Sequence, residues 1–153
     1  MLVESVRKKA EEYSKAAQTA LLILPESPAR TALEEFARFM SATVYLSTLD
    51  SILAMGQNFL VHLDAKTHKF QFIGWDLDNS FGQFALAGTQ EQREQLSIMK
   101  PWRGQNRFLE RVYQVEAFQK LYRARLAEFS TTIFQPARIA QQVDTEARDF
   151  GIE

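Results

Sequence analysis

The sequence of 153 residues contains no cysteine, and no run of about 18 apolar residues, the length needed to span a membrane, occurs in it. Without cysteine the chain forms no disulfide and has no thiolate chemistry. Charge of either sign is not in excess, because 18 Lys and Arg face 19 Asp and Glu, for a net charge of -1. A nucleic-acid-binding protein usually carries a basic excess or stripe. We therefore expect no membrane span in this chain and no nucleic-acid partner.

The residues that are present suit a folded domain. Hydrophobic residues make up 46% of the chain and charged residues 24%, and twelve phenylalanines supply material for a core. These values are ordinary for a globular protein of one domain, or for one lobe of a larger domain. The first 18 residues are charged and lack the apolar run of a signal peptide, although a signal could lie upstream.

Apolar residues recur at three- and four-residue spacing in four stretches, which indicates helices. The predicted helices are residues 4–24, a helix from Thr31 toward Leu49, residues 107–130 and residues 136–148. Thr31 has Glu34 three residues later, the pattern of a capping box, and prolines 25 and 28 are expected to separate the first two helices.

The middle of the chain has a different pattern. Residues 59–63 and 70–75 are rich in β-forming residues, and the polar stretch 64–69 between them predicts a β-hairpin. Residues 83–106 show little periodicity and are expected to form a long ordered loop with a helical turn near 90–96. A loop of this length is usually functional. The fold class that follows is α+β, mainly helical, with one hairpin.

Four polar residues stand where one predicted element gives way to the next: Asp50, Asn58, Asp76 and Asp78. Asn58 precedes the first strand and the two later aspartates follow the second. Because a hairpin brings these ends together, three carboxylates and one amide are expected to converge at one edge. Such oxygen ligands suit Mg²⁺ or Mn²⁺, with phosphate oxygens completing the coordination. The order of the four is that of a phosphoryl-transfer site, in which one Asp serves the nucleophile while an Asn and a later Asp hold metal.

The residues around this site resemble the CotH spore-coat kinase family. The resemblance rests on Asp50, on Gly56-Gln57-Asn58-Phe59, on Trp75-Asp76-Leu77-Asp78-Asn79-Ser80-Phe81-Gly82, and on the later segment 101–109. It covers roughly residues 30–130 and implies an atypical protein-kinase-like fold, of which this chain is the C-terminal lobe, with the hairpin carrying the site.

The resemblance also implies roles. Asp50 matches the catalytic aspartate, Asn58 a metal ligand, and Asp76 or Asp78 the metal-binding aspartate, so ATP with Mg²⁺ or Mn²⁺ is the expected cofactor. The expected substrate is a protein Ser or Thr hydroxyl, for instance on a coat or surface protein of a bacterium. Lys100 and Arg103, beside Arg107, form a small basic cluster near the long loop that could contact phosphate.

A kinase also needs a phosphate-covering loop and an ATP-pairing lysine on a strand. Residues 1–30 hold one predicted helix and a Pro-containing link, with no such strand. We therefore expect residues 1–153 to be a single partial domain that lacks the N-terminal lobe, and a fragment of a longer chain. The sequence does not indicate the acceptor, the oligomeric state or the compartment; a spore coat, cell surface or secreted location requires an upstream signal.

Two other functions stay open. One is a non-catalytic, kinase-like interaction module. The other is a haloacid-dehalogenase-like phosphatase, with Asp76 as the nucleophile, which needs a parallel sheet where a hairpin is predicted. An EF-hand is excluded because Phe81 and Ala87 stand where that loop needs Gly and Glu. His62, Asp64 and His68 are best explained as exposed hairpin residues, and nothing besides the carboxylates favours glycoside hydrolysis.

Overall fold

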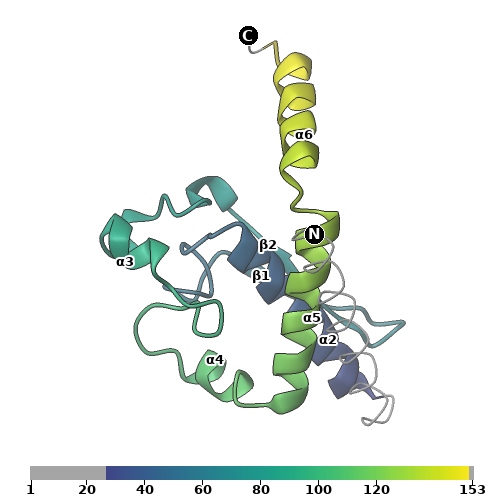
Figure 1. Cartoon of the computed structure of the whole chain (residues 1–153). Helices are drawn as coiled ribbons and strands as arrows, with labels where there is room; N and C mark the ends of the chain where they lie inside the picture. Colours follow the sequence, from purple (N-terminus) through teal and green to yellow (C-terminus); the bar gives the residue numbers. More distant parts are fainter. Residues whose placement is uncertain (1–26, 152–153) are drawn as a thin grey trace, which may run out of the picture.

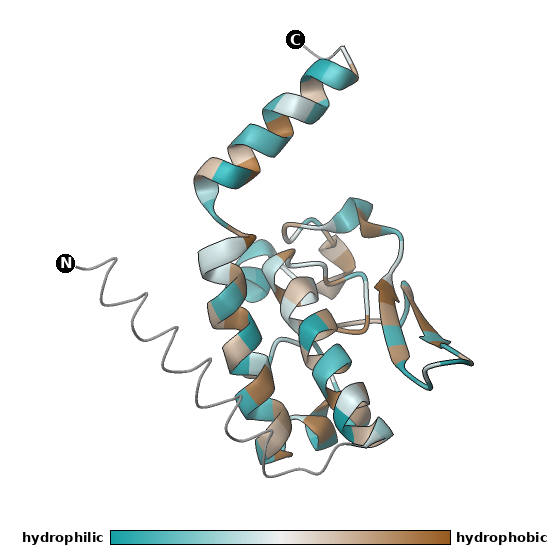
Figure 2. Ribbon diagram, turned by 90° about the vertical axis from the view of Figure 1, so that its right-hand side faces the viewer, coloured by the Kyte–Doolittle hydropathy of each residue, from teal (hydrophilic) through white to brown (hydrophobic). Residues whose placement is uncertain are grey.

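A computed structural model describes residues 27–151, so the helix predicted over residues 4–24 lies outside the described part. The described chain is mainly helical, with one two-stranded sheet at the edge of the helical part, which confirms the mainly helical α+β class (Figures 1 and 2). In chain order the elements are α2 (Pro28–Tyr45), β1 (Phe59–Leu63), β2 (Phe70–Gly74), the 3₁₀ turns η1 (Leu77–Asn79) and η2 (Ala85–Ala87), α3 (Gln90–Glu94), α4 (Arg107–Val112), α5 (Glu116–Thr132) and α6 (Pro136–Asp149).

Helix α2 begins earlier than the sequence predicts. Ser27 is its N-cap, and the Ser27 hydroxyl accepts a hydrogen bond from the Arg30 main-chain N–H at 3.2 Å. Pro28 opens the first turn, where its missing N–H has no partner to lose. The predicted start at Thr31 was therefore wrong, because Pro28 begins the helix instead of ending the preceding link. The helix stops at Tyr45, short of Leu49, and Ser47 turns the chain with a φ of 47°.

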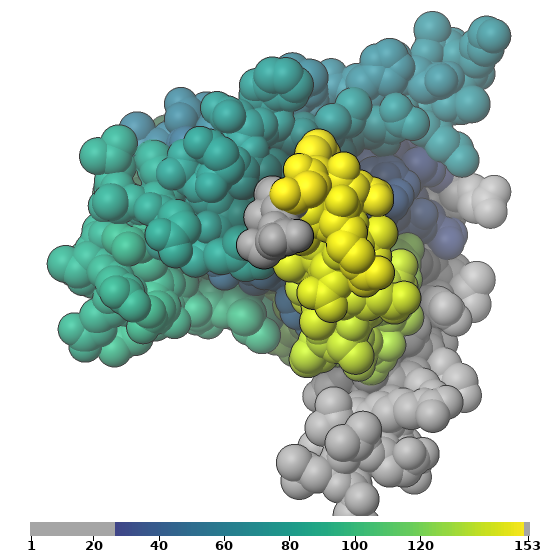
Figure 3. Space-filling model, turned by 90° about the horizontal axis from the view of Figure 1, so that it is seen from above, coloured from purple at the N-terminus to yellow at the C-terminus, as the bar shows by residue number. Residues whose placement is uncertain are grey.

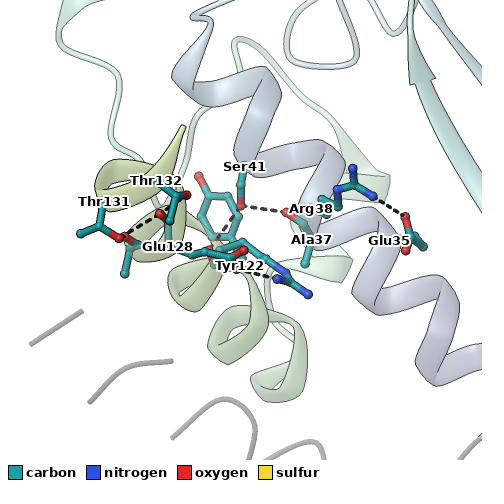
Figure 4. A network of polar contacts seen from close by, with 10 residues as sticks. Glu35, Ala37, Arg38, Ser41, Tyr122, Glu128, Thr131 and Thr132 are labelled. Carbon is teal, nitrogen blue, oxygen red and sulfur yellow. Dashed lines mark hydrogen bonds and ion pairs between the residues drawn. The ribbon is translucent and has the colours of Figure 1, made fainter. Parts of the chain in front are cut away.

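The core lies between α2 and α5, which run side by side (Figures 1 and 2). Ring contacts join the two helices, with 5.6 Å between the centroids of Phe36 and Phe118. Ser41 lies fully buried at the crossing, and its hydroxyl is 2.8 Å from the Ala37 carbonyl and 3.4 Å from the Tyr122 carbonyl (Figure 4). The small side chain of Ser41 lets the two backbones approach closely, and this packing fixes the position of α2.

The stretch 107–130 was predicted as one helix, but it forms the separate helices α4 and α5. Asn106 caps α4 by accepting a hydrogen bond from the Leu109 N–H at 3.0 Å. The chain then turns at residues 113–115, where the Gln119 amide donates to the Tyr113 carbonyl at 2.6 Å. The apolar spacing continues through this turn because both helices face the same core, so the spacing alone does not show the break.

The hairpin is confirmed with the predicted strands. Strands β1 and β2 are antiparallel and pair Leu60 with Ile73 and Val61 with Phe72. Phe72 packs against Phe39 of α2 at 5.7 Å between ring centroids, which anchors the sheet to the helical core. In the hairpin turn, Asp64 accepts hydrogen bonds from the main-chain N–H and hydroxyl of Thr67 and from the Lys66 N–H, and these bonds lower the pKa of the Asp64 carboxyl.

Helix α6 extends away from the rest of the described chain (Figures 1 and 2), and it lies in front of the other elements when the molecule is seen from above (Figure 3). It begins at Pro136, as the sequence predicts, and none of its residues is buried. Its exposed apolar side chains, Ile139 and Val143, lie one helical turn apart. Within residues 27–151, no helix is both long and apolar enough to cross a bilayer.

Two buried tyrosines provide a matched test of the core. Tyr122 donates its hydroxyl proton to the Ile98 carbonyl at 2.7 Å, whereas the nearby Tyr113 hydroxyl is buried with no hydrogen-bond partner among the described residues. We expect Tyr122→Phe to lower the free energy of unfolding by about 1 kcal/mol, because it leaves a carbonyl unpaired. Tyr113→Phe is expected to lower it by less than about 0.5 kcal/mol, or to raise it. Urea denaturation of the two variants checks the difference, and equal losses would contradict the assignment of partners.

The same tyrosines predict a loss of stability at high pH. Burial raises the pKa of Tyr122 from 10.0 to about 12 and raises the pKa of Tyr113 as well. Above pH 10 the unfolded chain therefore loses these protons before the folded chain does. We expect the free energy of unfolding to be unaffected by the two tyrosines below pH 10 and to fall as the pH rises from 10 toward 12. Urea denaturation at about pH 9 and about pH 11 measures this fall, which should be smaller in Tyr113→Phe.

Candidate functional site

Asp50 lies in the turn segment that follows α2, and its side chain is buried, with 7% of the residue exposed. The segment is held in place by the loop that precedes α4. The Asn106 amide donates to the Ile52 carbonyl at 3.0 Å, and the Arg103 main-chain N–H donates to the Leu53 carbonyl at 2.8 Å. These bonds connect residues far apart in the sequence, so the position of Asp50 is fixed by tertiary structure as well as by the end of α2.

Two consecutive side chains hold Asp50 from different sides. The Gln57 amide donates to Oδ1 of Asp50 at 2.6 Å. The Asn58 amide donates to the main-chain carbonyl of Asp50 at 2.9 Å. The structure thus brings Asp50 and Asn58 into direct contact. Because Asn58 uses its nitrogen for this bond, its carbonyl oxygen Oδ1 is left available, and oxygen is the atom that Mg²⁺ and Mn²⁺ prefer.

The hairpin brings the main chain at Asp76 close to the main chain at Asn58. Asn58 adopts a φ of 59°, and its carbonyl accepts a hydrogen bond from the Trp75 N–H at 2.9 Å. Asp76 is the next residue and also has a positive φ, of 52°. Asn and Asp take this left-handed conformation more readily than other residues with a side chain. Both residues stand at the open end of the same hairpin.

Asp78 lies differently from Asp76. Strand β2 ends at Gly74, before both aspartates, as the sequence predicts, and residues 77–79 form η1. Both aspartates are exposed, and the Asn79 amide donates to Oδ1 of Asp78 at 3.0 Å. Asp76 therefore directly follows Trp75, the residue bonded to Asn58, whereas Asp78 belongs to the next turn, η1.

The expected cluster of three carboxylates is not formed. Among residues 27–151, no group of three or more His, Asp or Glu side chains is arranged to hold a metal ion. Asn58 and Asp76 each carry a side-chain oxygen donor, and the Trp75–Asn58 bond keeps their backbones close together. Mg²⁺ is usually held by only one or two carboxylates together with water and the phosphate oxygens of a substrate.

The segment after η1 is tied to the end of α2. The N–H groups of Phe81 and Gly82 donate to the carbonyls of Leu46 and Ser47 at 2.6 and 3.0 Å. Arg93 of α3 donates to the Gly82 carbonyl at 2.7 Å and also to the Gly88 carbonyl. A pocket of about 320 Å³ lies beside this segment, lined by Phe81, Gly82 and residues of α3 among others. Asp50 does not line it.

The two basic residues predicted to bind phosphate lie in the loop between α3 and α4. Lys100 is exposed, and Arg103 donates from its guanidinium to the Gln92 side-chain oxygen at 3.3 Å. The main chain of Arg103 is bound to the Asp50 segment, as described above, but its side chain is directed toward α3. A phosphate-binding role for Lys100 and Arg103 stays a prediction.

The outer side of the hairpin carries exposed apolar side chains close to these polar groups. Leu60 and Ile73 are cross-strand partners with exposed fractions of 57% and 46%, and Trp75, between Ile73 and Asp76 in the chain, is 65% exposed. Exposed apolar side chains gathered on one pair of strands are typical of a surface that contacts a ligand or a partner. The hydropathy colouring shows how strongly apolar the two strands are (Figure 2).

The antiparallel pairing of β1 with β2 bears on the phosphatase alternative. That fold places its nucleophilic aspartate after a strand of a parallel sheet. In the described part of the chain, the strand before Asp76 pairs only with its hairpin partner, and in antiparallel orientation. The surroundings of Asp76 therefore do not support phosphatase chemistry.

The site thus combines a buried aspartate, an asparagine bonded to its main chain, and an aspartate at the open end of a hairpin. Residues 28–150 match the sequence model of the family described as CotH kinase protein, and the chain belongs to that family. No curated protein and no solved structure matches the chain. The family resemblance expected from the residues is thus confirmed over nearly the whole described part.

Sequence reasoning missed Gln57 as a residue of this site. Its position directly before Asn58 is the only signal that could have drawn attention to it. A glutamine in a turn is usually solvated, and nothing in its spacing reveals that its amide reaches back seven residues to Asp50.

Proposed function

We propose that this chain is the catalytic and metal-binding lobe of an enzyme that transfers the γ-phosphoryl group of ATP to a Ser or Thr hydroxyl of a protein. The observation that carries the proposal is the contact of Asn58 with the Asp50 main chain, at 2.9 Å, combined with the hairpin register that places Asp76 next to Asn58. In this proposal the base and the metal ligands come from three segments of the chain, which these two hydrogen bonds hold together.

In this proposal Asp50 is the catalytic base. Its free oxygen, Oδ2, accepts the proton of the acceptor hydroxyl, whose oxygen forms a bond to the γ-phosphorus as the bond to the β,γ-bridging oxygen breaks and ADP leaves. Asn58, through Oδ1, and Asp76 hold Mg²⁺ or Mn²⁺, with Asp78 nearby in η1. When bound, the metal neutralises charge on the phosphate oxygens. In this proposal Asp50 orients the nucleophile, and Asn58 and Asp76 orient the phosphates of ATP through the metal.

The exposed apolar side chains of the hairpin and the two basic residues of the loop between α3 and α4 complete the proposed nucleotide site. Leu60, Ile73 and Trp75 present an apolar surface beside the metal ligands, which suits the flat, apolar base of ATP. Lys100 and Arg103 contribute positive charge in the loop that braces the Asp50 segment.

The proposal includes the domain organisation. Residues 28–150 form one partial domain, and a preceding lobe supplies the phosphate-covering loop and the lysine that ATP binding requires. The acceptor is a protein such as a coat or surface protein, and the enzyme is then of bacterial origin, acting at a spore coat or cell surface.

A non-catalytic interaction module is the second candidate. Two observations favour it: Asp50 is only 7% exposed, and no three-acid cluster is present in residues 27–151. A module of this kind binds its partner without turning over ATP.

Metal-dependent ATP binding by the full-length protein that carries this chain separates the two functions. Isothermal titration of ATP in Mg²⁺, and again in EDTA, is the experiment. The kinase proposal predicts saturable binding that EDTA abolishes. Absence of ATP binding in Mg²⁺ and in Mn²⁺ would favour the interaction module and contradict the proposed function.

A further inference from the structure

We infer that Gln57 is the positioning residue for Asp50, holding its carboxylate so that one oxygen is reserved for the acceptor hydroxyl. The inference rests on the proposed function, because it assigns a role within the same site. It concerns a residue that touches neither substrate nor metal in that proposal and that acts only through Asp50.

The geometry of the contact carries the inference. The Gln57 amide nitrogen is 2.6 Å from Oδ1 of Asp50, a short hydrogen bond. Within residues 27–151 this is the only side-chain hydrogen bond to the Asp50 carboxylate, and Oδ2 has none. A carboxylate held at a single oxygen can no longer turn freely, and its second oxygen keeps one direction. General-base catalysis requires this, since the base must lie within about 2.6–3.2 Å of the hydroxyl whose proton it takes.

The chain directs Gln57 toward Asp50 through the turn on which it stands. Both of its neighbours have positive φ, 72° at Gly56 and 59° at Asn58, so the backbone reverses sharply on either side of it. The Gly56 N–H donates to the Ser51 carbonyl at 3.0 Å, which closes the turn onto the residue after Asp50. Gln57 and Asn58 therefore hold the side chain and the main chain of Asp50 from a single rigid turn.

The chemistry of an amide suits this role better than that of a cation. An uncharged N–H donor orients the carboxylate through one directional hydrogen bond and places no charge beside it. The Asp50 side chain is buried whereas Gln57 is exposed, so the Gln57 amide reaches the buried carboxylate from the surface.

The test is steady-state kinetics of the full-length protein with ATP and a protein acceptor, comparing wild type with Gln57→Ala. We expect kcat to fall roughly tenfold or more, since small misplacements of a reacting group are costly, with KM for ATP unchanged. Gln57→Glu keeps the length of the side chain but replaces the donor with a negative charge that faces Asp50. Its kcat is expected to fall further than that of Gln57→Ala. Gln114→Ala, at an exposed glutamine in the turn after α4, is the matched control and should match wild type.

A second measurement does not depend on turnover. In ¹H–¹⁵N spectra the resonance of the Gln57 side-chain amide should be displaced from that of a solvated glutamine by its hydrogen bond to the Asp50 carboxylate, and Asp50→Ala should remove that displacement. A Gln57 amide that resonates in wild type as a solvated glutamine would overturn the inference directly.

The outcomes separate this inference from the proposed function. Transfer in wild type with unchanged kcat in Gln57→Ala would overturn the positioning role alone. A fall in ATP affinity with unchanged kcat would also overturn it, because Gln57 would then act on the nucleotide. Absence of transfer and of ATP binding in wild type would overturn the proposed function, and the positioning role with it.

Discussion

Replacing Asp50 with asparagine is expected to lower kcat for phosphoryl transfer by about 10²- to 10⁴-fold, the range found when a general base is lost. Asparagine has nearly the same shape and keeps a side-chain oxygen that can accept the Gln57 hydrogen bond. It has no charge with which to take the proton of the acceptor hydroxyl. Steady-state phosphorylation of a protein acceptor by wild type and Asp50→Asn measures the effect.

The control for this variant is Asp144→Asn, at an exposed residue of α6, the helix that extends away from the rest of the described chain in Figure 1. It removes the same charge and is expected to leave kcat unchanged. Urea denaturation shows whether Asp50→Asn still folds, since Asp50 is buried and its main chain is bonded to Asn58. Equal activity in wild type and a folded Asp50→Asn would contradict the assignment of the base.

The second large effect is expected at the end of the hairpin. Asp76→Asn should lower activity at a fixed Mg²⁺ concentration by about 10²-fold or more, because bound metal contributes several kcal/mol of charge stabilisation. Asp78→Asn should lower it by less than about tenfold, since Asp76 alone follows the residue that pairs with Asn58 and Asp78 belongs to the next turn. Activity measured against Mg²⁺ concentration is the test.

A rise in Mg²⁺ should partly restore Asp76→Asn if the lost group is a metal ligand. Insensitivity of this variant to added Mg²⁺ would indicate another role for Asp76. A larger loss in Asp78→Asn than in Asp76→Asn would contradict the assignment of the ligand, and would place the metal beside η1 instead.

The hairpin could be predicted because its signal is local. Alternating apolar residues on both sides of a polar turn specify two paired strands, and the polar residues at the ends must then lie close together. The position of Asn58 beside Trp75 and Asp76 follows from such local signals. Helix α6 likewise begins at a proline, in the position where proline is favoured.

Other features depend on packing that the sequence pattern does not contain. The break between α4 and α5 keeps the apolar spacing intact, so residues 107–130 look like one helix. Pro28 can end one element or begin the next, and the choice depends on the Ser27 cap. In the site, Asp76 has a left-handed backbone conformation and is followed by η1. The carboxylates of Asp76 and Asp78 are therefore not aligned as they would be on a continued strand. The Gln57 contact depends on two left-handed residues that only the folded turn reveals.

The most direct test of the central claim is transfer of labelled γ-phosphate from ATP to protein, with wild type and Asp50→Asn of the full-length protein assayed side by side in Mg²⁺ and in Mn²⁺. The proposed function predicts label on Ser or Thr in the wild-type reaction, loss of that label in EDTA, and almost none with Asp50→Asn. Equal labelling by the two proteins, or no labelling and no ATP binding by wild type, would contradict it.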